Sequence, residues 1–304
     1  MNAVIILPTY NERENIATML EAISSVIKTI PSIQFKILVV DDMSPDGTKD
    51  VVLAYQKVHH AVYILSGKKA GLGKALLRGM TYAVDTLNAD VLIQMDADMS
   101  HDPTVLPKFI EKLNSGYDFV VGSRYIRGGS IPENWGIHRK IYSVIGNTFV
   151  RFGLGKSAVH DWTGGYRAFL ASYFQKAKTA VSPYSGYVFQ IAFLYTSLIH
   201  GARVGEVPIA FTDRKFGHSK IAPLEYIVSI IKFVISSRYR AVVRGTFPRF
   251  AAVGAIGFLI NTTILEFCVS FGFHPAAGSA MGAEFAILSN FILNNAWTFH
   301  HHKI

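Results

Sequence analysis

The sequence predicts an α/β protein in which a mainly parallel sheet precedes a helical membrane segment. Two observations indicate this fold class. Strand-like and helix-like segments alternate over residues 1–221, as they do in parallel sheets with crossover helices. Beyond residue 245, two long apolar runs follow one another with only a short connection between them.

The predicted sheet is built from short apolar runs that alternate with segments of helical periodicity. The first run is apolar but has no basic segment before it and reaches Pro8 early, so it predicts a buried strand and not a signal peptide. We expect strands at Val4–Leu7, Phe35–Val40, Ala61–Leu65, Val91–Met95 and Phe119–Ser123, and helices at Asn15–Ile27, Thr48–Val58 and Gly73–Leu87.

Composition restricts the class of protein. The 304 residues are 50% hydrophobic and 17% charged, which excludes a disordered chain. The net charge of +9 favours anionic partners, such as nucleic acid, anionic lipids or phosphorylated substrates. Because Cys268 is the only cysteine, disulfides within the chain and cysteine metal clusters are excluded.

The two apolar runs, 250–271 and 276–297, have 22 residues each. As helices they would be about 33 Å long, enough to cross a bilayer core of about 30 Å. Each contains a single acidic residue, Glu266 in the first and Glu284 in the second. Buried helices of this length are uncommon in soluble proteins, so the sequence favours a transmembrane hairpin over a pair of core helices.

Basic residues predict how this hairpin is oriented. Four arginines precede the first run, and the positive-inside rule places that side in the cytoplasm; they are Arg238, Arg240, Arg244 and Arg249. Just before them, residues 223–237 have apolar side chains at helical spacing. This pattern fits an amphipathic helix in the membrane interface and, equally, a helix packed on the soluble domain.

Acidic residues follow two of the predicted strands, at the sheet edge where ligands of α/β proteins bind. Asp41 and Asp42 follow one strand, and Asp96 and Asp98 follow another. Two carboxylates separated by one residue can hold Mg²⁺ or Mn²⁺, with phosphate oxygens as further ligands. Taken alone, the same residues fit a turn or a helix cap. The common glycine-rich phosphate loops are absent from the sequence.

Together, these motifs resemble a known family. In order, they are Pro8–Asn15, Val40–Asp42 with Ser44–Thr48, Lys69–Gly73, Met95–His101, Gly122–Tyr125, Asn134–Trp135, Arg139–Lys140, Asp161–Arg167, Glu206–Pro208 and Arg214–Lys220. The series resembles the dolichyl-phosphate (polyprenyl-phosphate) mannose synthases, which are inverting enzymes with the GT-A fold in glycosyltransferase family 2. The hairpin resembles a truncated GtrA-like membrane domain, with two spans where that domain has four; the matching residues are Arg249–Phe250, Val253–Gly254, Asn261 and Asn290–Phe299.

The resemblance implies three segments: a GT-A catalytic domain (1–221), an amphipathic interfacial segment (222–245) and a transmembrane hairpin (246–304). It also implies site residues. Those matched to the nucleotide sugar are Pro8, Tyr10, Glu12, Val40, Asp42, Asp96, Ala97, Asp98, Arg124, Arg214 and Lys220. Those matched to the acceptor phosphate are Arg124, Arg139, Ser143 and Arg214. Asp96 and Asp98 match the metal ligands, and Asp98, Arg124 and Arg214 match the catalytic residues.

The implied reaction moves mannose from GDP-mannose to dolichyl or polyprenyl phosphate, giving a lipid-linked β-mannosyl donor for protein glycosylation. The implied cofactor is Mg²⁺ or Mn²⁺, and the implied partners are both substrates and the lipid bilayer, but no nucleic acid. The catalytic domain is expected on the cytoplasmic face of the membrane. Because a lipid phosphate is already ionised near neutral pH, a protein general base is not required.

Three other functions compete with this one. A related enzyme could use another donor, such as UDP-glucose, with undecaprenyl phosphate. A processive polysaccharide synthase would carry a Gln-x-x-Arg-Trp motif, and none of the three tryptophans follows an arginine. A non-enzymatic module that binds or flips a lipid carrier would not need the acidic and basic positions together. The sequence departs from the family at Ser100, where some relatives have Gln, and at Ala192, where relatives often have Glu.

Overall fold

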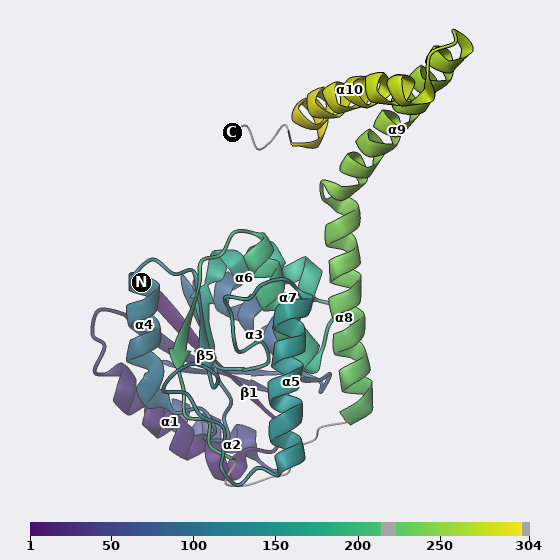
Figure 1. Ribbon diagram of the computed structural model, residues 1–304. Helices are drawn as coiled ribbons and strands as arrows, with labels where there is room; N and C mark the ends of the chain where they lie inside the picture. Colours follow the sequence, from purple (N-terminus) through teal and green to yellow (C-terminus); the bar gives the residue numbers. More distant parts are fainter. Residues whose placement is uncertain (214–222, 300–304) are drawn as a thin grey trace. The chain divides into compact units, whose positions relative to one another are not determined.

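The computed structural model describes residues 1–213 and 223–299. Contacts divide the chain into two compact units, Met1–Phe233 and Val234–Ile304. The first unit contains a seven-stranded sheet with helices on both faces, and the described part of the second unit is helical (Figure 1).

The sheet has the strand order β3-β2-β1-β4-β6-β5-β7. Every neighbouring pair is parallel except the two that involve β6, which runs antiparallel to both β4 and β5. The prediction of a mainly parallel sheet is therefore confirmed. The strands are β1 (Asn2–Thr9), β2 (Gln34–Asp41), β3 (Val62–Ser66), β4 (Val91–Gln94), β5 (Phe119–Ser123), β6 (Arg167–Leu170) and β7 (Val204–Pro208).

All five predicted strands and all three predicted helices are present, with ends that differ by a few residues. The helices of the first unit are α1 (Arg13–Ile27), α2 (Thr48–Gln56), α3 (Leu72–Asp85), the 3₁₀ turn η1 (Pro103–Val105), α4 (Leu106–Asn114), α5 (Ile137–Gly153), α6 (Ala171–Val181) and α7 (Gly186–Ile199). Helix α8 (Pro223–Arg244) begins in the first unit and ends in the second.

Alternating side chains of the strands pack against helices on the two faces of the sheet. Ile5 of β1 belongs to a buried cluster with Met19 of α1 and Phe109 of α4. Ile6, the next residue, faces α3 on the other side, where Gly79 allows close approach. A Cβ at Gly79 would lie 2.6 Å from Val40 Cγ2, so any other residue would push α3 away from the sheet.

The reversed strand β6 determines which loops meet at the carboxyl edge of the sheet. Gln94 at the end of β4 pairs with Arg167 at the start of β6, and Val121 of β5 pairs with the same Arg167. The segment that precedes β6 therefore reaches the edge at which β4 and β5 end. This brings residues 161–166 beside the loops that follow β4 and β5.

The second unit contains two helices that are long and apolar enough to span a membrane, α9 (Phe247–Ser270) and α10 (Pro275–Leu293), the latter extended by the π-helical turn η2 (Asn294–Thr298). They correspond to the two predicted spans. Glycines on each helix face an asparagine of the other: Gly257 lies against Asn290, and Gly282 lies against Asn261. These small residues let the two backbones approach closely, as in other membrane helix pairs.

Helix α8 has features of both interpretations of its sequence. Phe233 is buried and packs edge-on against Tyr184 and Tyr195 of the first unit. Other apolar side chains of the same helix are exposed: Ile227, Val228, Ile231 and Ile235. The helix thus packs on the first unit by one face and keeps a separate apolar face.

Candidate active site

The residues predicted to hold the nucleotide come together at the carboxyl ends of β1 and β2. Pro8 and Val40 are paired neighbours in the sheet. The loops that follow these strands are joined by hydrogen bonds, because the Asn11 amide donates to Ser44 Oγ and the Glu12 amide donates to Thr48 Oγ1, both at 3.0 Å. The motifs Pro8–Asn15, Val40–Asp42 and Ser44–Thr48 therefore lie side by side at one edge of the sheet.

Asp42 in this group has a partner that the sequence did not indicate. Its Oδ1 accepts a hydrogen bond of 2.8 Å from Arg78 Nη2, and the side chain of Asp42 is buried. The guanidinium fits because residue 67 is glycine: a Cβ there would lie 2.5 Å from Arg78 Cζ. Arg78 thus orients the carboxylate expected to bind the ribose.

A lysine covers the neighbouring aromatic residue. Lys69 Nζ lies 3.3 Å from the centre of the Tyr10 ring, which is a close cation–π contact. This contact brings the Lys69–Gly73 motif to the loop after β1. A positive charge therefore stands at the predicted nucleotide position, where it would favour a diphosphate.

The two aspartates that follow β4 have different surroundings. The Asp96 side chain is 34% exposed and lines a cavity at the edge of the sheet. Asp98 is buried, and its Oδ1 accepts hydrogen bonds from the Ser100 amide (3.1 Å) and from Ser100 Oγ (2.6 Å). Ser100 therefore orients Asp98, and Ala97 between the two aspartates is buried.

His101 contacts the same turn, and the sequence did not identify it as a residue of the site. Its Nδ1 accepts the amide hydrogen of Asp96 at 2.9 Å, and its Nε2 lies 3.9 Å from Asp96 Oδ2. Complete burial lowers the pKa of His101, although the charges of Asp96 and Asp98 oppose that shift. The ring is consequently neutral, and the accepted hydrogen bond assigns its proton to Nε2.

Arg124 follows β5 and forms a two-point ion pair with Asp161. Arg124 Nε donates to Asp161 Oδ2 at 2.7 Å, and Arg124 Nη2 donates to Asp161 Oδ1 and to Thr163 Oγ1 at 2.8 Å each. Burial alone would raise the pKa of Asp161, but the guanidinium and its hydrogen bonds hold that pKa below the ordinary 3.8. Arg124, predicted to bind phosphate, is thus also a support of the loop that begins at Asp161.

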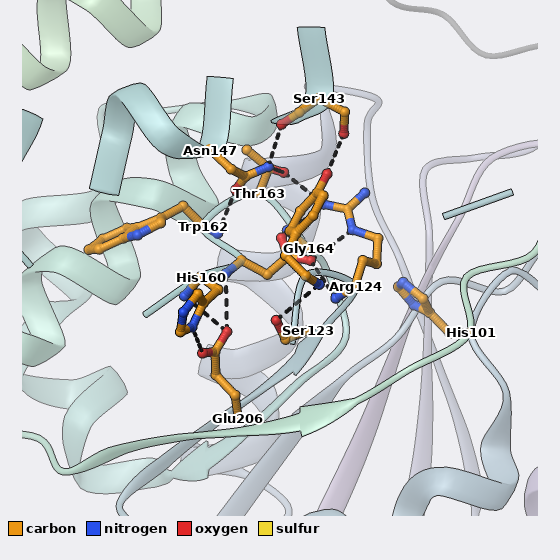
Figure 2. A network of polar contacts seen from close by, with 12 residues as sticks. His101, Ser123, Arg124, Ser143, Asn147, His160, Trp162, Thr163, Gly164 and Glu206 are labelled. Atoms are coloured by element: carbon orange, nitrogen blue, oxygen red, sulfur yellow. Dashed lines mark hydrogen bonds and ion pairs between the residues drawn. The ribbon is translucent and has the colours of Figure 1, made fainter. Parts of the chain in front are cut away.

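Two further buried groups hold this loop. Glu206 of β7 accepts hydrogen bonds of 3.1 Å from the amides of His160 and Asp161, and His160 Nδ1 lies 2.7 Å from its second oxygen (Figure 2). Arg167 donates to the backbone carbonyls of Trp162, Gly164 and Gln190. Burial lowers the pKa of Arg167 to about 9, so the group still carries its proton at neutral pH.

The hydrogen bond from Arg167 to the Gln190 carbonyl lies close in sequence to Ala192, the position at which relatives often have Glu. Gln190 and Ala192 both lie in α7, and both side chains are buried. Ala192 therefore contributes to the packing of α7 and lines no part of the cavity.

Helix α5 carries two of the four predicted acceptor residues, Arg139 and Ser143. Arg139 stacks on Trp135, with Cζ 3.8 Å from the ring centre, and its Nη1 lies 3.6 Å from Asp213 Oδ1. Ser143 Oγ lies 2.5 Å from the Tyr125 hydroxyl. Burial raises the pKa of Tyr125, which keeps this hydroxyl protonated. Arg214 and Lys220, the other two predicted basic residues, lie outside the described residues.

One cavity connects the acidic and basic groups. Its lining includes Asp96 and His101 from the loop after β4, Arg124 from the loop after β5, Arg139 from α5, and Thr163, Gly164 and Gly165 from the loop before β6. Residues far apart in the sequence therefore present two carboxylates, those of Asp96 and Asp213, and two guanidinium groups to one space. This arrangement suits a substrate with phosphate groups and a divalent cation.

Comparison with known families identifies the catalytic unit. Residues 4–177 match the model of glycosyl transferase family 2, which is more than half of the chain. The chain belongs to glycosyl transferase family 2. Residues 249–304 match the GtrA/DPMS transmembrane domain, so this family 2 enzyme ends in a membrane domain.

Individual relatives agree with this assignment. A protein of Mycolicibacterium smegmatis named polyprenol monophosphomannose synthase is 40% identical over 72% of this chain and 80% of its own length. A protein of Pyrococcus furiosus named dolichol-phosphate mannosyltransferase is 32% identical over 98% of this chain and 81% of its own length. A solved structure of glucosyl-3-phosphoglycerate synthase from Mycobacterium tuberculosis, in complex with Mn²⁺, UDP and phosphoglyceric acid, has a TM-score of 0.55 at 17% identity and covers 78% of each chain, which confirms the GT-A fold.

The aspartates of this family 2 enzyme fit a divalent cation. Carboxylate oxygens are the ligands that Mg²⁺ and Mn²⁺ prefer, and Asp96 opens onto the cavity. Gly165 leaves space beside it, because a Cβ there would lie 3.6 Å from Asp96 Oδ1. Among the described residues no group of three or more acidic, histidine or cysteine side chains forms a ligand set. Asp96 and Asp98 would therefore supply the protein ligands of the cation, and substrate oxygens or water would fill its remaining coordination positions.

Several supporting residues could not be assigned from the sequence, although signals for some of them were present. Asp161 and Glu206 both lie in motifs used for the family resemblance, yet nothing in the sequence pairs them with residues 37 and 45 positions away. His101 also lies in such a motif, Met95–His101, and nothing in the sequence indicates that it accepts a hydrogen bond from the Asp96 amide. Arg78 lies in α3 beyond the Lys69–Gly73 motif, and only its contact with Asp42 identifies it.

Proposed function

We propose that this enzyme transfers mannose from GDP-mannose to dolichyl or polyprenyl phosphate, forming a β-linked lipid phosphate sugar. The observation that carries this proposal is the cavity lined by both Asp96 and Arg139, the latter from helix α5, whose large apolar side chains are exposed. A lipid phosphate needs both a cationic group for its head and an apolar surface for its chain. The names of the two curated relatives support the same acceptor class and sugar.

On the donor side, the nucleoside would lie across the ends of β1 and β2. Glu12 can accept hydrogen bonds from the guanine edge, and Asp42, oriented by Arg78, can accept them from the ribose hydroxyls. Tyr10 and Lys69 would contact the base or the diphosphate. The backbone of Pro8, Val40 and Ala97 would form the floor of this site.

Asp96 and Asp98 would hold Mg²⁺ or Mn²⁺, which when bound neutralises charge on the leaving nucleoside diphosphate. Ser100 orients Asp98 for this task, and His101 fixes the backbone at Asp96. Arg214 and Lys220, from the motif after β7, are proposed to bind the diphosphate as well. Arginine suits this role because its planar fork can grip two phosphate oxygens.

On the acceptor side, the phosphate would be held by Arg139 and Ser143 of α5, with Arg124 and Arg214. Helix α5 exposes apolar side chains to its surroundings: Ile137, Ile141, Tyr142, Val144, Ile145, Phe149 and Phe152. So large an exposed apolar surface on one helix is unusual for a protein in water. It fits a polyprenyl chain or the membrane from which that chain emerges.

The chemistry then requires little proton transfer. The acceptor phosphate oxygen is already ionised and attacks the anomeric carbon on the face opposite the leaving diphosphate, so the configuration inverts. Positioning by the cavity and electrostatic stabilisation by Asp98, Arg124 and Arg214 would supply most of the rate enhancement. No side chain is needed as a general base.

We also propose the functional limits of the segments: a catalytic domain of residues 1–221, an interfacial segment of 222–245 and a membrane hairpin of 246–304, with the catalytic domain on the cytoplasmic face. The four arginines before and within the first span support this orientation. The exposed apolar face of α8 supports attachment to the membrane interface.

A donor screen tests the proposal. Purified full-length protein in detergent is incubated with polyprenyl phosphate and Mn²⁺, and with GDP-mannose, GDP-glucose or UDP-glucose as donor. We expect a lipid-linked product with GDP-mannose that disappears in EDTA. Product formed with UDP-glucose alone would replace the donor assignment, and absence of any lipid-linked sugar would contradict the acceptor class.

A further inference from the structure

Helix α5 has an unusual distribution of polar and apolar residues. Asn147 and Val150 are its buried residues, whereas most of its large apolar side chains are exposed. Arg139, Ser143 and Asn147 follow one another at intervals of four residues, so they share one face of the helix. That polar face is the one turned toward the catalytic unit, since Arg139 lines the cavity and Ser143 contacts Tyr125.

Asn147 makes use of both ends of its side-chain amide. Its Oδ1 accepts the amide hydrogen of Trp162 at 2.7 Å. Its Nδ2 donates to the Ser143 carbonyl at 2.9 Å and to Thr163 Oγ1 at 3.2 Å. Figure 2 shows this side chain between α5 and the loop that carries Trp162 and Thr163. Only 4% of Asn147 is exposed, so water does not compete for these bonds.

The loop on the other side of these bonds is held by two arginines as well. Thr163 Oγ1 also accepts from Arg124 Nη2 at 2.8 Å, and the Trp162 carbonyl accepts from Arg167 Nη2 at 2.8 Å. Trp162 itself is fully buried. Asn147 thus connects a helix with few buried side chains to a loop that Arg124 and Arg167 also hold. Within the described part of the chain, the side-chain hydrogen bonds between α5 and residues 162–163 both belong to Asn147.

We propose that Asn147 is a positioning residue for the acceptor: it fixes α5, and with it Arg139 and Ser143, relative to the loop 161–165. This inference rests on the proposed function, in which Arg139 and Ser143 hold the lipid phosphate. An error of about 1 Å in placing a reacting group is enough to reduce a rate substantially. The residues proposed for the base and ribose lie at the ends of β1 and β2 and not on this helix, so we expect donor binding to change little.

The test compares Asn147→Ala with two control variants of the same helix. Thr148→Ala alters an exposed neighbour, and Val150→Ala removes apolar contact but keeps the bonds of Asn147. For each full-length protein in detergent we would measure the KM for polyprenyl phosphate at saturating donor, the Kd of the nucleotide sugar, and hydrogen exchange of amides 137–150.

We expect Asn147→Ala to raise the acceptor KM about tenfold, to leave the donor Kd within about twofold, and to speed exchange over residues 137–146. Thr148→Ala should match the wild type in all three measurements. Asn147→Asp keeps the acceptor for Trp162 but loses the donated bonds, so it should resemble Asn147→Ala. It also serves as the second variant if the alanine protein does not fold.

An Asn147→Ala protein with wild-type acceptor KM and exchange would overturn the proposal. So would an equal loss of donor and acceptor binding, because that pattern indicates general destabilisation. The exchange measurement needs no substrate. If the wild type uses no lipid phosphate at all, the proposed function fails, and the exchange over α5 still decides whether Asn147 holds this helix.

Discussion

Arg124 and Asp161, 37 residues apart, form a buried two-point ion pair with Nε–Oδ2 and Nη2–Oδ1 distances of 2.7 and 2.8 Å. The pair joins the end of β5 to the loop before β6. A guanidinium in this pair presents less net charge to a phosphate than a lone arginine would, because the carboxylate compensates it. Its contribution to the site is therefore geometric as well as electrostatic.

Removing one partner of this pair should cost more than removing both. We expect Asp161→Asn to destabilise the protein by about 3–5 kcal/mol, because it leaves the buried charge of Arg124 without its partner. The double variant Asp161→Asn with Arg124→Met should recover part of that loss. Urea denaturation of the four proteins of the double-mutant cycle measures both values. Additive effects would show that the ion pair has no coupling energy.

The same pair predicts an acid dependence of stability. The folded-state pKa of Asp161 lies below its ordinary value of 3.8, so the unfolded chain binds more protons at acid pH. The stabilisation is therefore complete above the ordinary pKa and is lost as the pH falls through the folded-state value. Melting temperatures between about pH 6 and pH 3 should fall less steeply for Asp161→Asn than for the wild type. Parallel curves would contradict this contribution.

Arg139 should separate acceptor use from donor binding. We expect Arg139→Ala to raise the KM for polyprenyl phosphate at least about tenfold, because a phosphate head near a membrane needs fixed positive partners. Lysine at this position should restore activity only in part, since a point charge lacks the planar fork that stacks on Trp135. Acceptor titration and a separate donor Kd give the two readouts. Weakened donor binding with normal acceptor kinetics would move Arg139 to the donor side.

Both aspartates after β4 should be required for transfer. We expect Asp96→Ala or Asp98→Ala to lower kcat/KM by at least about a hundredfold, which corresponds to about 2.7 kcal/mol of transition-state stabilisation. Asp102→Ala, which removes only the cap of η1, is the matched control. Initial rates across a range of Mn²⁺ concentrations provide the measurement. Near-normal turnover of Asp98→Ala in EDTA-treated protein would exclude the metal role.

The membrane hairpin should be dispensable for donor binding. A chain that ends at Ser237 retains Phe233, whose contacts with Tyr184 and Tyr195 belong to the catalytic unit. We expect this shortened protein to fold and to bind the nucleotide sugar with the affinity of the full chain. Circular dichroism checks that the shortened protein folds, and titration calorimetry measures its affinity for the nucleotide sugar. A folded protein that no longer binds nucleotide would show that the hairpin contributes to the donor site.

Much of the fold could be predicted because its signals are local. The first five strands are apolar runs, and the spans are long apolar helices, so each element is visible within its own residues. Strands β6 and β7 are no shorter than β4 and β5, but each contains a charged residue, Arg167 or Glu206, and no comparable apolar run, so the prediction missed them. Helix α5 was also missed, although Ile137, Ile141, Val144 and Ile145 recur at helical spacing in its sequence.

The candidate site was predicted as a set of residues but not as a geometry. The motifs indicated Asp42, Asp96 and Arg139, and the structure brings the last two to one cavity. The bonds that orient them join residues far apart in sequence, as with Arg78 on Asp42 across 36 positions. Such pairs depend on strand order, which local patterns do not reveal. The assigned roles of the site residues stay predictions.

The reversed direction of β6 has a consequence for how such an enzyme can diversify. The residues proposed for the base and ribose lie at the ends of β1 and β2, whereas Arg139 and Ser143, two of the four residues proposed for the acceptor phosphate, lie in α5. Because β6 is inserted between β4 and β5 in the opposite sense, the loop before it is separated from the ends of β1 and β2 by β4. A graft of residues 136–166 from a relative that keeps Asp161, the partner of Arg124, could therefore exchange acceptor preference while the recognition of the base and ribose is inherited unchanged.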